Sequence, residues 1–318
     1  MCDSEKELLT AMKLPIAKYR ISFSVVKPFK ISFMAGSSIR GSFGNTLRKI
    51  ACMTHLKDCN SCPLHDSCPY TCIFVPPVPE KETIQKFSNI PLGYLLEVPV
   101  ENEHVYEIGE KFSFNIVLFG YTINHLSLIV FALIKSMQNN IAHGKAVFST
   151  LEHYDSEGNT TVIYQQGDSK ISDHDKYLVL PEGANTVSSV RLKFLTPLRL
   201  QKDGKICKPE TMTARDFLMP LFRRIGLLFE FYTEIHLNLD YGKLGEEFEK
   251  IEIFTSMQWK DYFRFSSRQN KKMNIGGYIG ELELKNISPI VRQFLDLGMY
   301  THVGKNVTFG LGQFSIIE

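Results

Sequence analysis

Hydrophobic and polar residues alternate along several short segments of the chain, whereas longer segments repeat hydrophobic residues at helical spacing. The alternation over Lys18–Val26 predicts a β-strand, because successive side chains of a strand point to opposite faces. The spacing of Ile39, Phe43 and Leu47 predicts a helix that is capped by Ser37 or Ser38 and runs through Ile50. The same patterns predict strands over 92–100 and 111–119, a helix over 124–139, and a hairpin across 148–166 that turns at 156–159.

The second half of the chain repeats this order of elements. The patterns predict strands over 190–200, 251–259, 278–284 and 313–317, and helices over 213–235 and 289–297, with Thr213 as the cap of the first helix. Two successive halves of strand, helix, two strands, helix and strand predict an α+β protein made of tandem ferredoxin-like (RRM-like) domains. The polar segment 167–176 is linker-like and the strand 177–180 is assigned to the first half, so we expect domains at 1–185 and 186–318.

Charge and hydropathy limit the classes of function. The 318 residues include 36 Lys and Arg against 34 Asp and Glu, so a nucleic-acid partner requires a local basic surface. The uninterrupted apolar core Leu128–Leu133 is far shorter than the ~20 residues of a membrane span, so we expect no membrane partner. The N-terminus opens with acidic residues and has no signal-peptide pattern, which predicts a cytoplasmic protein.

A cysteine- and proline-rich insert at 52–79 follows the first predicted helix. Cys59 and Cys62 are separated by two residues, a spacing with which thiolates grip one tetrahedral Zn²⁺, and Cys52 and Cys68 would complete four ligands. The alternatives are reduced, partly buried thiols, with Cys72 as a fifth, and an iron–sulfur cluster. Four sulfur ligands leave no open position, so any metal here is expected to be structural.

Basic and aromatic residues are interleaved between Trp259 and Gly277. Five cations stand against the single acid Asp261, namely Lys260, Arg264, Arg268, Lys271 and Lys272, beside Trp259, Tyr262, Phe263 and Phe265. Cations that neutralise phosphates beside aromatic rings on which bases stack are typical of single-stranded RNA binding. The alternative is a solvated strand-to-loop region whose aromatic residues belong to the core.

The C-terminal segment HVGKNVTFGLG, residues 302–312, is punctuated by Gly304, Gly310 and Gly312. Glycines let backbone N–H groups approach a phosphate closely, and Lys305 adds a positive charge in the same loop. The segment has neither the order of the phosphate loop of nucleotide hydrolases nor that of a Rossmann loop. The alternative is a glycine-rich turn that leads into a closing strand.

Five segments together resemble the repeat-processing endoribonucleases of CRISPR systems, which belong to the RAMP superfamily (CRISPR-associated protein six family). These segments are IRGSFGNTLRKIAC, CNSCPLHDSCPY, FLTPLRL, MQWKDYFRFSSRQNKKMNIGGYIGEL and HVGKNVTFGLGQF, and they span about Gly36 to Phe314 in the order of the family. The resemblance implies two ferredoxin-like domains, a glycine-rich loop near the C-terminus and metal-independent cleavage of precursor CRISPR RNA within its repeats. The resemblance also implies the chemistry, in which the ribose 2′-hydroxyl attacks the adjacent phosphate and the products are a 2′,3′-cyclic phosphate and a 5′-hydroxyl.

The family chemistry requires a general base, a general acid and positive charge near the phosphate. Many members carry a base histidine in or just after the first helix, where this chain has only His55, displaced toward the insert. We therefore expect His302 with Lys305 as the catalytic pair, and His55 with Arg40 or Arg48 as its rival; His143 is a further alternative. The expected RNA-binding residues are Arg40, Arg48, Lys260, Arg264, Arg268, Gln269, Lys271, Lys272, Gly304, Lys305, Gly310 and Gly312. His104, His125, His153, His174 and His236 lack cation-rich neighbourhoods in the sequence.

Three functions remain open from the sequence. The first is an endoribonuclease whose partner is CRISPR repeat RNA or its mature product and whose catalysis needs no cofactor. The second is a non-catalytic RAMP-fold subunit that binds guide RNA among the subunits of a CRISPR effector complex, which the histidine-free first helix favours. The third is a zinc-stabilised scaffold, for which no salt-dependent RNA affinity is expected.

Overall fold

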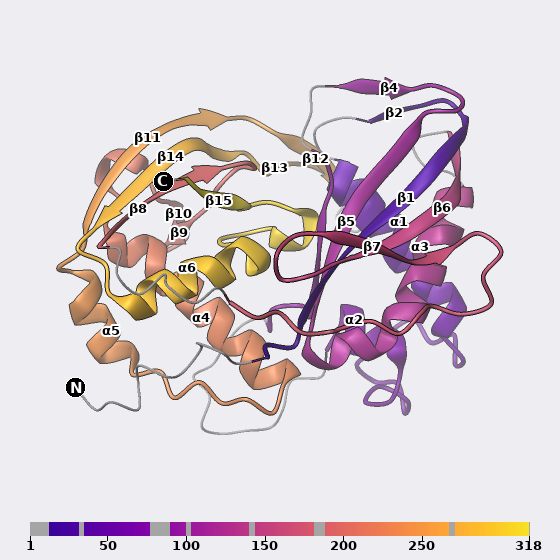
Figure 1. The fold of residues 1–318 in the computed structure, drawn as a ribbon, viewed down its shortest axis with the longest axis horizontal. Helices are drawn as coiled ribbons and strands as arrows, with labels where there is room; N and C mark the ends of the chain where they lie inside the picture. Colours follow the sequence, from indigo (N-terminus) through magenta and orange to yellow (C-terminus); the bar gives the residue numbers. More distant parts are fainter. Residues whose placement is uncertain are drawn as a thin grey trace. The chain divides into compact units, whose positions relative to one another are not determined.

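The computed structural model describes residues 13–31, 35–76, 90–99, 103–139, 144–180, 188–266 and 271–317. The chain divides into two compact units (Figure 1). Among the described residues, the N-terminal unit holds 15–176 and 231–233, and the C-terminal unit holds 13–14, 177–230 and 234–317.

The N-terminal unit is built on a five-stranded antiparallel sheet with the order β3-β5-β1-β6-β7. Its elements are β1 (Ile16–Lys27), β2 (Phe29–Ile31), α1 (Ala35–Ala51), α2 (Pro69–Phe74), β3 (Tyr94–Glu97), β4 (His104–Tyr106), β5 (Lys111–Phe119), α3 (Leu126–Asn139), β6 (Lys145–Tyr154) and β7 (Thr160–Gln165). Strands β1, β3, β5 and β6 with helices α1 and α3 have ferredoxin-like order, and β7 extends the sheet beyond β6. A short ribbon of β2 and β4 lies apart from this sheet.

Strand register gathers a set of large apolar residues of this unit on one face of the sheet. Ile21 lies opposite Phe114 on β5 and Leu151 on β6, and all three are buried. Helix α1 buries residues such as Ile39 and Phe43, which share a helix face because they are four residues apart. The N-terminal core therefore lies between this face of the sheet and its helices.

The C-terminal unit is a second ferredoxin-like fold with a four-stranded antiparallel sheet in the order β11-β14-β8-β15. Its elements are β8 (Ser189–Phe194), β9 (Gln201–Lys202), β10 (Lys205–Ile206), α4 (Ala214–Tyr232), α5 (Tyr241–Phe248), β11 (Glu252–Lys260), β12 (Phe263–Ser266), β13 (Lys271–Asn274), β14 (Gly277–Lys285), α6 (Pro289–Thr301) and β15 (Phe314–Ile317). Figure 1 shows α4 and α6 along one side of this sheet. Buried residues of β8 such as Phe194 contact Phe217 of α4 and Phe314 of β15. Tandem ferredoxin-like architecture is thus confirmed.

Several element bounds differ from those predicted. Helix α1 begins at Ala35, so Ser37 and Ser38 lie inside the helix and do not cap it. The predicted strand 177–180 is reduced to one isolated bridge between Leu178 and Leu14 in the C-terminal unit. The linker-like segment 167–176 packs within the N-terminal unit, where the Ser172 N–H donates to the Ile163 carbonyl.

Other local predictions are confirmed. The hairpin of β6 and β7 turns at residues 155–159, where Asp155 accepts from the N–H of Asn159. Thr213 caps α4, because its hydroxyl accepts from the Asp216 N–H while the Asp216 carboxylate accepts from the Thr213 N–H. Helix α5 and the β12–β13 hairpin were not predicted. None of the helices in the described part of the chain is long and apolar enough to cross a membrane.

Candidate nucleic-acid interface

The glycine-rich segment connects the end of α6 to β15 in the C-terminal unit. Gly304, Gly310 and Gly312 have φ values of 95°, 90° and 71°, the left-handed region that favours glycine. A Cβ on Gly312 would lie 1.8 Å from the carbonyl oxygen of Val303. The glycines therefore allow a tight loop whose two limbs pass close to each other.

Several N–H groups of this loop donate hydrogen bonds within the protein. Gly312 donates to the Pro197 carbonyl at 3.0 Å and Gly310 donates to Val307 at 2.8 Å. In this conformation these two amides are therefore paired within the protein, and phosphate binding by the segment stays a prediction. Glycine suits both positions because their backbone conformation is left-handed. At Gly312 it is also required because the Val303 carbonyl oxygen is too close for a Cβ.

His302 lies at the C-terminal end of α6 and has no exposed surface. Its N–H donates to the Gly298 carbonyl at 2.8 Å, and its φ of 55° turns the chain out of the helix. A general base must approach within hydrogen-bond distance of the proton that it abstracts. The expectation that His302 faces an RNA phosphate is therefore not met by this conformation, in which it is part of the core.

Lys305 is an exposed residue of the same loop, and a backbone hydrogen bond fixes its position. Its N–H donates to the carbonyl oxygen of Arg199 at 2.9 Å. The guanidinium of Arg199 donates to the Gly276 carbonyl at 2.6 Å and lies 5.9 Å from the centroid of the Trp259 ring. Arg199 thus connects the glycine-rich loop to the base of the basic hairpin. Sequence reasoning missed it, although it lies in the FLTPLRL segment that carries the family resemblance.

A polar network fixes the base of the β12–β13 hairpin. Asp261 accepts from Trp259 Nε1 and from Asn274 Nδ2, both at 2.9 Å, and these hydrogen bonds lower the pKa of its carboxyl group. Asn274 in turn accepts from the N–H of Gly276 at 2.7 Å. The carboxylate of Asp261, the single acid in the basic stretch, is therefore hydrogen-bonded within the protein. The exposed residue Lys260 precedes it at the end of β11.

The remaining basic residues belong to the hairpin itself. Arg264 lies on β12 opposite Met273, and Lys271 and Lys272 lie on β13 opposite Ser266 and Phe265. Arg268 and Gln269 lie outside the described residues, as do the side chains of Arg264, Lys271 and Lys272. The backbone therefore places the predicted basic stretch on a hairpin that rises from β11 and β14.

The rival catalytic residues lie in the N-terminal unit. His55 is exposed, with a φ of 55°, in the loop that follows α1. The guanidinium of Arg48 donates to the carbonyls of Leu56 and Lys57 at 2.6 and 3.0 Å, so it holds this loop. Arg40 is half-buried and lies over the Phe74 ring at 4.9 Å. His143 lies outside the described residues.

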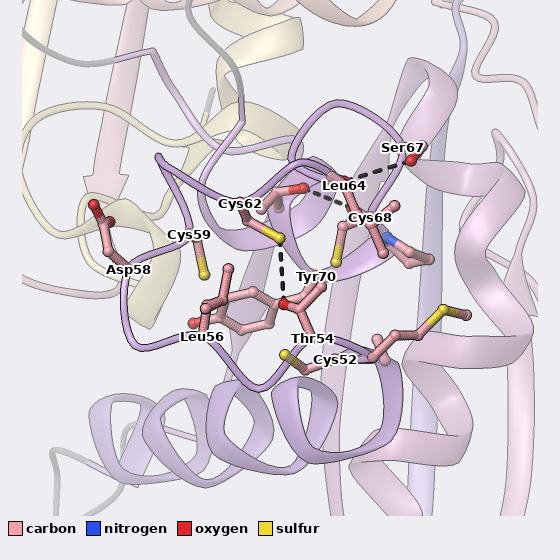
Figure 2. A pocket seen from close by; sticks show the side chains of 14 residues that line it. Cys52, Thr54, Leu56, Asp58, Cys59, Cys62, Leu64, Ser67, Cys68 and Tyr70 are labelled. Carbon is pink, nitrogen blue, oxygen red and sulfur yellow. Dashed lines mark hydrogen bonds between the residues drawn. The ribbon is translucent and has the colours of Figure 1, made fainter.

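The predicted metal ligands Cys52, Cys59, Cys62 and Cys68 line one pocket at the end of α1 (Figure 2). Cys72 is not among the residues that line it. In the described part of the chain, no group of three His, Cys, Asp or Glu side chains is arranged to hold a metal ion as it stands. The structure therefore brings the four cysteines together without a preformed coordination site.

Two histidines that the sequence left without a role meet beside Tyr19. The rings of His153 and His174 lie 5.0 Å apart, and His174 Nε2 lies 3.0 Å from the Tyr19 hydroxyl. His174 Nδ1 lies 2.9 Å from the Ser172 carbonyl, which can only accept, so Nδ1 carries the proton and Nε2 accepts from Tyr19 in the neutral ring. Burial, and then His174, lower the pKa of His153. The 21-residue separation of the two histidines gave no signal of this contact.

Two family models match the chain. Residues 14–176 match the model AF_1859_N, described as an N-terminal domain, and residues 192–314 match the model of the CRISPR-associated endoribonuclease Cas6. The second match contains Arg199, the basic hairpin and the glycine-rich loop. A comparison with curated protein sequences found no significant match.

Solved Cas6 structures share the fold of the chain. The Thermus thermophilus Cas6 named TTHB231 is 12% identical, with a TM-score of 0.52 over 96% of this chain and 100% of that one. Its product complex gives 11% identity and a TM-score of 0.53 over 95% and 100%. A chain of a partial Cas6-RT-Cas1–Cas2 complex is 13% identical, with a TM-score of 0.55 over 97% of this chain and 47% of that one.

Proposed function

The chain belongs to the Cas6 family of CRISPR-associated endoribonucleases, with an AF_1859-type N-terminal domain, and we propose that it cuts precursor CRISPR RNA within its repeats. The ribose 2′-hydroxyl would attack the adjacent phosphate without a metal ion, leaving a 2′,3′-cyclic phosphate and a 5′-hydroxyl. We place this reaction in the cytoplasm as part of the same proposal.

One observation carries the proposal for RNA binding. Within the domain that matches the Cas6 model, exposed Lys305 and Lys260 lie on two segments that Arg199 joins, with the Trp259 ring beside the guanidinium. Cations next to an aromatic ring supply phosphate neutralisation and a stacking platform on one surface. The cations of the β12–β13 hairpin would continue this surface along the RNA.

His55 is our proposed acid or base. It is exposed, whereas His302 is buried, and Arg48 holds the loop that carries it. An imidazole side chain can accept the 2′-hydroxyl proton as a general base or give a proton to the 5′-oxygen as a general acid. Arg40 or Arg48, which belong to the same unit as His55, would stabilise the negative charge that develops on the phosphate.

The absence of histidine from α1 favours a second function, a guide-RNA-binding subunit without nuclease activity. Such a subunit would meet other CRISPR proteins, as does the similar chain that is part of a Cas6-RT-Cas1–Cas2 complex. Both functions predict that the logarithm of RNA affinity falls with the logarithm of salt concentration.

Incubation with an end-labelled CRISPR repeat RNA in EDTA separates the two functions. We expect cleavage of the all-ribose RNA and no cleavage of an otherwise identical RNA with one 2′-deoxy nucleotide at the cut site. Tight binding without cleavage at any protein concentration would leave the guide-binding function. Cleavage that requires added Mg²⁺ would refute the metal-independent mechanism.

A further inference from the structure

Four cysteines of the insert converge on one cavity in the N-terminal unit. The cavity has a volume of about 140 Å³, and its lining combines these thiols with apolar residues such as Leu56 and Tyr70. Figure 2 shows the sulfur atoms of Cys52, Cys59, Cys62 and Cys68 directed into the space around Thr54. The RNA surface proposed above uses none of these thiols.

We propose that this cavity binds one structural Zn²⁺ ion through the thiolates of Cys52, Cys59, Cys62 and Cys68. Zinc prefers four thiolate ligands in a tetrahedron, with Zn–S distances of about 2.3 Å. Because all four positions are filled by sulfur, the ion has no open position for a substrate or for water. The inference concerns the folding of the insert and does not depend on the proposed nuclease function.

The backbone presents the four thiols from different sides. Cys52 follows the last turn of α1, where its N–H donates to the Arg48 carbonyl at 2.9 Å, and Cys68 directly precedes α2. Cys59 and Cys62 flank a tight turn in which the N–H of Cys62 donates to the carbonyl of Cys59 at 3.2 Å. One ion would therefore join the end of α1, the turn and the start of α2.

Cys72, the fifth cysteine of the insert, lies outside the cavity that the other four line. Cys72 lies within α2, and its Sγ donates to the carbonyl oxygen of Asp66 at 3.9 Å. It does not line the cavity. The sequence offers five cysteines for four zinc ligands. Because Cys72 lies outside the cavity, its replacement is a matched control for replacement of the four proposed ligands.

Zinc binding requires a local rearrangement. Thr54 Oγ1 lies 3.3 Å from Cys62 Sγ, between the thiols, and no three ligands in the described part of the chain have metal geometry as they stand. The four sulfurs must move inward and displace this hydroxyl, while each thiol gives its proton to solvent.

Arg48 provides the charge that such a site requires. Four thiolates and one Zn²⁺ carry a net charge of −2, and the Arg48 guanidinium lies 5.8 Å from the centroid of the Tyr70 ring, which lines the cavity. Its hydrogen bonds to the carbonyls of Leu56 and Lys57 hold the guanidinium next to the loop. The loop between Cys52 and Cys59 would thus be fixed at both ends by the metal and in its middle by Arg48.

Metal analysis of the full chain tests the inference. After purification with zinc and dialysis we expect about one zinc ion per chain, and far less than one in Cys59→Ser and in Cys62→Ser. Cys72→Ser and Cys207→Ser, which change free cysteines away from the cavity, should keep the full zinc content. A loss in Cys72→Ser as large as in Cys59→Ser would overturn the assignment of ligands.

Two measurements on the unmodified chain remain decisive if the serine variants do not fold. Titration with Co²⁺ should give the intense sulfur-to-cobalt absorption and the visible bands of tetrahedral thiolate coordination, and Zn²⁺ should abolish both. Zinc should also protect four thiols from a thiol-reactive dye. A zinc content far below one per chain with all thiols reactive would refute the site, and bound iron with acid-labile sulfide would replace zinc by an iron–sulfur cluster.

Discussion

Arg199 donates a hydrogen bond of 2.6 Å to the carbonyl oxygen of Gly276. This bond joins the segment after β8 to the base of the basic hairpin, while the carbonyl of Arg199 itself accepts from Lys305 in the glycine-rich loop. One residue therefore positions two parts of the proposed RNA surface. A half-buried guanidinium in this role is a positioning group as much as a phosphate ligand.

Replacing Arg199 by Met should weaken repeat-RNA binding by about tenfold, because a hydrogen bond from a charged group contributes about 1.5 kcal/mol or more. The dissociation constant, measured by filter binding at several salt concentrations, tests this. Arg215→Met is the control, since Arg215 is exposed and paired with Glu249. Equal losses in both variants would show that net charge alone controls binding.

Lys305 is exposed and should contact phosphate without reading sequence. We expect Lys305→Ala to weaken binding of all RNA sequences similarly and to reduce the slope of log affinity against log salt by about one. Lys243, exposed on α5 and paired with Asp240, provides a control of the same charge. An unchanged slope in Lys305→Ala would remove this residue from the interface.

Gly312→Ala should destabilise the fold by about 3 kcal/mol or more. The new Cβ would meet the Val303 carbonyl oxygen at 1.8 Å and would also require a φ of 71° from an L-residue. Gly158→Ala isolates the second effect, because Gly158 has a φ of 86° but nothing within 4 Å of its added Cβ, so about 1 kcal/mol is expected. Urea unfolding measures both, and equal losses would contradict the packing account.

The architecture could be predicted because its signals are local. Alternation in Lys18–Val26 and the spacing of Ile39, Phe43 and Leu47 reflect the two sides of a strand and one face of a helix, and the structure has β1 and α1 at these places. The start of α1 could not be predicted in this way. Serine is a favourable N-cap residue, but the helix begins at Ala35, before Ser37 and Ser38.

The site was less predictable because its contacts join residues far apart in the chain. Arg199 and Gly276 are 77 residues apart and His302 resembles any surface histidine in the sequence, yet the first pair bonds and His302 is buried. The glycines correctly indicated a tight loop. The sequence could not show that the N–H groups of Gly310 and Gly312 donate hydrogen bonds to carbonyl groups within the protein. Local pattern identifies elements, whereas burial and pairing depend on tertiary packing.

The histidine pair beside Tyr19 predicts a pH dependence of stability. Burial and then His174 lower the pKa of His153, while Asp175 and Asp155 act more weakly in the opposite direction. In the unfolded chain the pKa is about 6.5. The folded state then binds fewer protons, so the unfolding free energy is unaffected above about pH 6.5 and falls as the pH decreases below it.

His153→Gln should reduce this fall between about pH 6.5 and pH 5, as measured by urea unfolding at each pH. His236→Gln is the control. His236 is exposed, and its ion-pair partner in the described part of the chain is Glu230. If His153→Gln and the unmodified chain lose stability in parallel with pH, His153 is not the group responsible.

Alanine replacement of His55 and His302 should separate catalysis from folding. His302 has no exposed surface, so His302→Ala should cost about 2 kcal/mol or more of stability, while cleavage per folded molecule stays within about threefold of the unmodified chain. His55 is exposed, so His55→Ala should change stability by less than about 0.5 kcal/mol and slow single-turnover cleavage of repeat RNA by about 100-fold or more. His104→Ala, an exposed histidine of β4 that faces Glu110, controls for loss of a surface imidazole. Unchanged cleavage in His55→Ala together with a large loss in folded His302→Ala would reverse the assignment, and it would require His302 to leave the core when RNA binds.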